Sequence, residues 1–150
     1  MAHPEHDPPP WATAAAEALA AAGYRRGGAR AAVIGLLDEQ GCALSAAEIE
    51  ALLRDRGGRG VARASVYRIL EELEGVRMVT RVEVGHGLAR FEAARREGHH
   101  HHMVCDACGS VTPFQDAELE RTIHRLADRV TFEVAEHDVV LHGACGDCAT

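Results

Sequence analysis

The sequence lacks a long apolar run, a secretory signal and lysine. No stretch approaches the ~18 consecutive apolar residues that a membrane-crossing helix needs. The first ten residues are acidic and rich in proline, without the positive start and apolar centre of a secretory signal, and they are expected to form a disordered leader. We therefore expect a cytoplasmic protein with no membrane partner, whose 150 residues form one ordinary domain or two small ones.

The charge is distributed unevenly along the chain. The net charge of −7 argues by itself against a nucleic-acid partner, and all 16 basic residues are arginine. Between positions 54 and 68, however, Asp55 is the one acid among five arginines: Arg54, Arg56, Arg59, Arg63 and Arg68. A local basic patch on an acidic protein is the pattern expected when one face alone meets phosphate.

The first part of the chain has the apolar spacing of helices. Runs that end at glycine or begin at a capping residue predict four helices, over about 11–22, 29–40, 46–56 and 61–73. Ser45 followed three residues later by Glu48 has the form of a capping box, which opens the third helix. The fourth helix combines an apolar face with a polar, cationic N-terminal end.

An alternating pattern follows the fourth helix. Residues 78–84 and 88–92 alternate around Gly85-His86-Gly87, which predicts a hairpin. Helix, loop, helix and hairpin in this order predict a winged helix-turn-helix, whose second helix enters the major groove by its N-terminal residues. We expect contacts to guanine or phosphate from Arg63, Ser65, Tyr67 and Arg68. The alternative is a small helical bundle whose arginines are only solvated surface.

The second part of the chain contains two Cys-x-x-Cys pairs, Cys105/Cys108 and Cys145/Cys148. Four thiolates form the closed ligand set of a structural zinc site. Because the two pairs are far apart in the sequence, this site would hold both ends of the unit together. A redox dithiol is the competing interpretation, which two pairs without a βαβ pattern disfavour. The pattern predicts two short strands, over 103–105 and 110–114, a helix opened by Asp116, and one or two extended segments over 131–141. Together these elements predict a small α+β domain.

Four consecutive histidines precede the first cysteine pair. In an extended segment, successive side chains point to opposite faces, so His99 and His101 are expected to serve one site. Their partners must come from elsewhere in the fold. The best are Glu120 on the helix and His137 on the last extended segment, with His124 in reserve.

The opposite face of the run presents His100 and His102 toward the hairpin, where Glu92 lies. We expect these three residues to form a regulatory site across the hinge between the two domains. Metal would then act as a ligand that selects the geometry competent to bind DNA.

Taken together, the motifs resemble those of the ferric uptake regulator family of metal-dependent bacterial repressors. The resemblance covers about residues 10–148, through Ala64-Ser-Val-Tyr-Arg-Ile-Leu70, Ala89-Arg-Phe-Glu92, the histidine run with Cys-x-x-Cys-Gly, and His137 to Cys148. It implies a winged-helix DNA-binding domain over 11–92, a linker over 93–98 and a metal-binding dimerisation domain over 99–150. It also implies a homodimer that binds an operator with dyad symmetry when metal is present.

The resemblance also implies ligand sets. They are a structural zinc site at Cys105, Cys108, Cys145 and Cys148, and a further site at His99, His101, Glu120 and His137. Glu92, His100 and His102 stand where the family's iron-type pattern has regulatory ligands, whereas Ala43 and Pro113 replace two others. Cys42, His86 or water are the alternatives for the open positions, and the regulatory metal is Zn²⁺ or Fe²⁺.

Several other functions remain as alternatives. The first is a zinc hydrolase that uses the histidine cluster with Glu92 or Glu120 as general base, although the sequence has no His-Glu-x-x-His and little room for a substrate cleft. A zinc-stapled interaction module without a DNA role is another. Within the family, a zinc-uptake or peroxide-sensing regulator is possible. Our leading expectation is a repressor with no enzymatic activity and no small-molecule substrate, which controls metal uptake or homeostasis.

Overall fold

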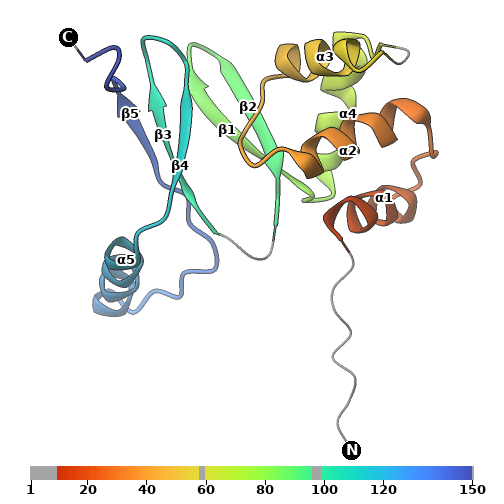
Figure 1. The fold of residues 1–150 in the computed structure, drawn as a ribbon. Helices are drawn as coiled ribbons and strands as arrows, with labels where there is room; N and C mark the ends of the chain where they lie inside the picture. The colour runs from red at the N-terminus through yellow and green to blue at the C-terminus, as the bar shows by residue number, and fades with distance from the viewer. Residues whose placement is uncertain (1–9, 58–59, 96–98, 150) are drawn as a thin grey trace, which may run out of the picture. The chain divides into compact units, whose positions relative to one another are not determined.

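The structure is a computed structural model that describes residues 10–57, 60–95 and 99–149. The predicted leader lies outside these residues apart from Pro10, as do residues 96–98 of the predicted linker and Arg59 of the basic patch. The chain divides into two compact units, Met1–Arg95 and Arg96–Thr150 (Figure 1). In the part of the chain that is described, no helix is long and apolar enough to cross a membrane.

The described residues of the first unit form four helices followed by a hairpin. Its elements are α1 (Trp11–Ala21), α2 (Gly28–Glu39), α3 (Ala46–Asp55), α4 (Arg63–Gly75), β1 (Val79–Gly85) and β2 (Leu88–Ala93). The predicted capping box is present, because the Ser45 hydroxyl accepts from the Glu48 N–H and the Glu48 carboxylate accepts from the Ser45 N–H. The strands pair antiparallel, and Gly85, His86 and Gly87 all have positive φ, so the hairpin turns where the sequence predicts.

The apolar faces of the helices form the core of this unit. The buried face of α4 is the predicted one and consists of Val66, Ile69, Leu70 and Leu73. Arg30 on α2 donates from Nε and Nη2 to the two carboxylate oxygens of Glu72 on α4, at 2.7 and 2.8 Å. A bidentate pair of this kind fixes direction as well as distance. The apolar faces and the bidentate Arg30–Glu72 pair together hold α4 in place.

In the second unit, residues 99–149 form a three-stranded sheet and one helix. Its elements are β3 (His101–Cys105), β4 (Val111–Phe114), α5 (Ala117–Arg129) and β5 (Val140–Gly143). The strand order is β4-β3-β5, with β3 antiparallel to β4 and parallel to β5. The two units together have the α+β architecture that the sequence predicts, a helical part with a hairpin followed by an α/β part.

Two details of the second unit differ from the sequence prediction. Strand β3 begins at His101, before the apolar residues, because the β4 and β5 backbones pair with the end of the histidine run. The stretch 131–141 supplies one strand, at its end, and β5 continues to Gly143. Thr131 follows α5 with a φ of 54°, a left-handed conformation that a strand does not use. Residues 132–139 belong to no helix or strand, so His137 lies in irregular chain before β5 rather than on the predicted extended segment.

The second unit leaves large apolar side chains exposed. Leu126 on α5 is 54% exposed, and Val130 and Phe132 just beyond the helix are each 66% exposed. Met103 and Leu141 are register partners on neighbouring strands, 45% and 49% exposed. Exposed apolar side chains of this size on a small unit are typical of an interaction surface.

Candidate metal centres and nucleic-acid interface

The four paired cysteines meet at one end of the second sheet. Because β3 and β5 run parallel with Cys105 opposite Gly143, the turns that follow both strands lie side by side. The four sulfur atoms all lie within 4.8 Å of one another, and Cys108 Sγ is 3.8 Å from Cys145 Sγ. A tetrahedral zinc ion with Zn–S bonds of ~2.3 Å requires S···S separations of about 3.8 Å. The thiols therefore fit a structural zinc ion.

Hydrogen bonds favour the thiolate form of two of these cysteines, which is the form that binds a cation. Backbone N–H groups of Cys145 and Cys108 lower the pKa of Cys105 to about 6, and the Cys145 N–H lies 3.3 Å from Cys105 Sγ. A hydrogen bond with the Ser110 hydroxyl lowers the pKa of Cys108. Hydrogen bonds with the neighbouring thiols, Cys145 foremost, raise the pKa of Cys148 to about 12. Full ionisation of all four thiols therefore requires a bound cation to offset their mutual repulsion.

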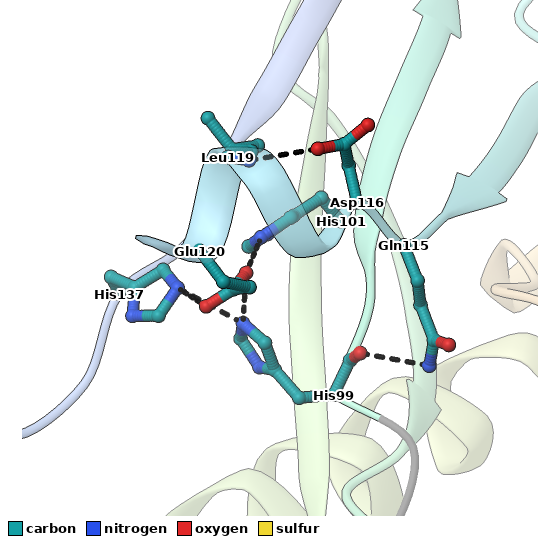
Figure 2. A network of polar contacts seen from close by, with 7 residues as sticks. All are labelled: His99, His101, Gln115, Asp116, Leu119, Glu120 and His137. Atoms are coloured by element: carbon teal, nitrogen blue, oxygen red, sulfur yellow. Dashed lines mark hydrogen bonds and ion pairs between the residues drawn. The ribbon is translucent and has the colours of Figure 1, made fainter. Parts of the chain in front are cut away.

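A second cluster joins His99, His101, Glu120 and His137, whose candidate ligand atoms also lie within 4.8 Å of one another. The Glu120 carboxylate lies at its centre (Figure 2). Its Oε1 is 2.6 Å from His101 Nε2 and its Oε2 is 2.9 Å from His137 Nε2. His99 Nε2 lies 3.2 Å from His137 Nε2. The hydrogen bond to His101, foremost among its contacts, lowers the pKa of Glu120.

The side chains of this second cluster come from three separate segments of the chain. Asp116 Oδ1 accepts from the Leu119 N–H at 2.7 Å, which starts α5 in the register that turns Glu120 inward. The Gln115 side chain donates to the His99 carbonyl at 2.9 Å and so holds the histidine run beside the start of the helix (Figure 2). His137 comes from the irregular segment before β5.

The chemistry of this cluster suits a divalent metal. His101 is 1% exposed, and its Nδ1 has no hydrogen-bond partner among the described residues. A buried imidazole that directs Nε2 toward a carboxylate and two further imidazoles matches the ligand preferences of zinc and iron. His124, the predicted reserve, lies outside the cluster, with its ring centroid 6.5 Å from that of His137.

The predicted regulatory site divides between the two units. Glu92 lies on β2 of the first, whereas His100 and His102 belong to the second, where their ring centroids are 4.9 Å apart. Their grouping with Glu92 remains a prediction.

The positions that depart from the family pattern carry side chains unable to bind metal. Ala43 is buried, and Pro113 pairs in register with His102. Of the alternative ligands, Cys42 is exposed and His86 lies in the hairpin turn with a φ of 53°.

The predicted DNA contacts lie on the outer face of α4. Arg63 is its first residue, Tyr67 is 47% exposed and Arg68 is also exposed, whereas Ser65 is half-buried. Sequence reasoning did not identify Glu50 on α3, whose carboxylate pairs with Arg63 at 2.7 Å. Residues on different helices have no spacing rule, so the sequence carried no signal for this pair.

Comparisons with known proteins agree with this architecture. The model of the "Ferric uptake regulator family" matches residues 21–142. The ferric uptake regulation protein of Bordetella parapertussis is 35% identical over 88 residues, which are 59% of this chain and 63% of that protein. The chain thus spans less than two thirds of the length of this relative.

Solved structures match over more of the chain. The ferric uptake regulator of Vibrio cholerae is 31% identical with a TM-score of 0.77, covering 86% of this chain and 98% of that one. That of Helicobacter pylori, described as having three functional metal binding sites, is 26% identical with a TM-score of 0.80, covering 93% and 94%. The chain belongs to the ferric uptake regulator family.

Proposed function

We propose that this protein is a metal-responsive transcriptional repressor of the cytoplasm, which binds operator DNA as a homodimer when its regulatory site is filled and so controls metal uptake. The observation that carries the proposal is the His99, His101, Glu120 and His137 cluster. A metal there would tie the histidine run, α5 and the segment before β5 together. The same chain carries exposed Tyr67 and Arg68 on the second helix of a helix-turn-helix.

Two kinds of metal site have different roles in this proposal. The four thiolates hold a structural Zn²⁺, since a closed sulfur set leaves no open position for chemistry. The regulatory site holds the divalent ion that is sensed, Zn²⁺ or Fe²⁺, because its imidazole ligands suit both. We assign Glu92, His100 and His102 to the regulatory site. His99, His101, Glu120 and His137 form the second site.

The exposed apolar side chains of the second unit support a homodimer. Met103 and Leu141 lie together on the sheet, Leu126 lies on α5, and Val130 and Phe132 lie just beyond its end. A second copy of the chain would cover surface of this kind, and a two-fold dimer presents two recognition helices to an operator with dyad symmetry. Members of this family are transcription regulators rather than enzymes, so we do not retain the zinc hydrolase.

The proposal is tested by metal analysis followed by DNA binding. Protein purified without added metal should retain about one Zn²⁺ per chain from the four thiolates. A duplex selected by the metal-loaded protein from a random-sequence pool should then be bound more tightly as Zn²⁺ or Fe²⁺ is added, by about 5- to 150-fold for typical coupling between two sites. Equal DNA affinity across the whole metal series would overturn the proposed function.

A further inference from the structure

Two arginines share one carboxylate between the helices of the helix-turn-helix. Glu50 lies in α3, where its Oε1 accepts from Arg54 Nη2 at 2.9 Å and its Oε2 accepts from Arg63 Nε at 2.7 Å. The Glu50 side chain is 18% exposed, against 66% for Arg54 and 58% for Arg63. The two guanidinium groups therefore cover the carboxylate and remain largely open to solvent themselves.

This arrangement leaves Arg63 able to bind DNA. A guanidinium has five N–H donors, and Arg63 gives only its Nε–H to Glu50. Within the described part of the chain its two Nη groups make no hydrogen bond, so they are left for a phosphate or a guanine. Exposed ion pairs contribute little to folding, so the main consequence of Glu50 concerns charge and orientation at this surface. With Glu50 ionised, the three residues carry one net positive charge instead of two.

We propose that Glu50 is a specificity-determining residue for DNA binding. It holds Arg63 in one orientation at the start of α4, and it cancels a positive charge that would otherwise attract any phosphate. Sequence-independent affinity comes mainly from counterions released as phosphates are neutralised, so an internal carboxylate weakens binding to every duplex. On the operator alone, Arg63 is already oriented toward the base or phosphate that it contacts, and this contact offsets the affinity that the Glu50 charge removes. This inference rests on the proposed function, because it requires α4 to be the helix that enters DNA.

The variant Glu50→Gln tests the proposal, because it keeps the length of the side chain and one oxygen but removes the charge. Affinity is measured with the full-length, metal-loaded protein across a salt series. The probes are the duplex that wild-type protein selects from a random-sequence pool and a scrambled duplex of the same composition. One further phosphate contact steepens the salt dependence by about 0.9 and strengthens binding about fivefold near 0.15 M salt. We expect that change on the scrambled duplex, a smaller gain on the selected one, and a specificity ratio that falls by a factor between one and about five.

Two control variants separate charge from orientation. Glu39→Gln makes the same change in net charge. It removes the charge that pairs with Arg56 at 2.5 Å, and Arg56 lies at the end of α3 rather than on α4. It should leave the specificity ratio near that of the wild type. Glu50→Asp keeps the charge on a shorter side chain. Its scrambled-duplex affinity should match the wild type, whereas its operator affinity should fall because Arg63 is no longer held.

The outcomes are distinguishable. The proposal is overturned if the specificity ratio of Glu50→Gln protein is unchanged while its melting temperature and zinc content match the wild type. It is also overturned if the specificity ratio of Glu39→Gln protein falls as much as that of Glu50→Gln. If the metal-loaded wild-type protein binds its selected and scrambled duplexes equally, the proposed function itself is wrong and this inference falls with it. That result would be visible before any variant is made.

Discussion

His101 and Glu120, which are 19 positions apart in the sequence, lie with Nε2 and Oε1 2.6 Å from each other. This contact joins the first residue of β3 to the first turn of α5, and His137 Nε2 lies at 2.9 Å from the other oxygen of the same carboxylate. A metal ion that replaces these hydrogen bonds would therefore stabilise the second unit.

The variant Glu120→Gln tests this stabilisation. Removal of the central charge should abolish metal binding at this cluster while the four thiolates keep their zinc. A ligand at 100 times its dissociation constant stabilises a folded protein by about 2.7 kcal/mol, and this increment should disappear. The measurement is the melting temperature with and without added Zn²⁺, together with metal content. Glu118→Gln, two residues earlier in α5 and outside the cluster, is the matched control and should respond to Zn²⁺ as the wild type does. A full metal-dependent shift in the Glu120 variant would reject the site.

The variant Cys108→Ser tests the sulfur site. Loss of one thiolate should release zinc, because the remaining ligands leave an open position and the binding free energy of this metal is folding free energy. Zinc content, thiol titration and melting temperature follow the change. Cys42→Ser is the control, since Cys42 is exposed and outside the cluster, and it should retain both zinc and stability. The assignment is wrong if the Cys108 variant keeps its zinc and its melting temperature.

Arg68→Ala should weaken operator binding without loss of zinc. Arg68 is exposed on α4, and one lost phosphate contact lowers the salt slope by about one. Arg125→Ala on α5 removes the same charge from the second unit and should leave the slope unchanged. Affinity is followed by fluorescence anisotropy across a salt series. If operator affinity survives Arg63→Ala, Tyr67→Phe and Arg68→Ala combined, α4 does not contact DNA in the way proposed.

The last prediction separates the two faces of the histidine run. Replacement of His100 and His102 by alanine should remove the metal dependence of DNA binding and leave both the four-thiolate zinc and the dimer intact. Replacement of His99 and His101 should act instead on the stability and metal occupancy of the second unit. Operator affinity with and without metal, measured for both double variants, distinguishes the roles. Identical behaviour of the two proteins would show that the faces are not separate sites.

Local patterns in the sequence were enough to predict the fold class and most elements. The capping box at Ser45 and the apolar face of α4 depend on residues three or four positions apart, a spacing set by the helix itself. The thiol pairs are equally local, because each Cys-x-x-Cys turn brings two ligands together without help from the rest of the fold.

Tertiary structure decided which distant groups meet. His99 and His137 are 38 positions apart, and nothing in their spacing brings their rings to a centroid distance of 4.7 Å; the β3, α5 and β5 packing does. The same holds for Glu50 and Arg63, whose pairing depends on how α3 packs against α4. The sequence by itself determined the kinds of ligand and most of the helices and strands. Only the packing of elements from separate parts of the chain, driven by burial of their apolar faces, determined which charges and ligands lie within contact distance.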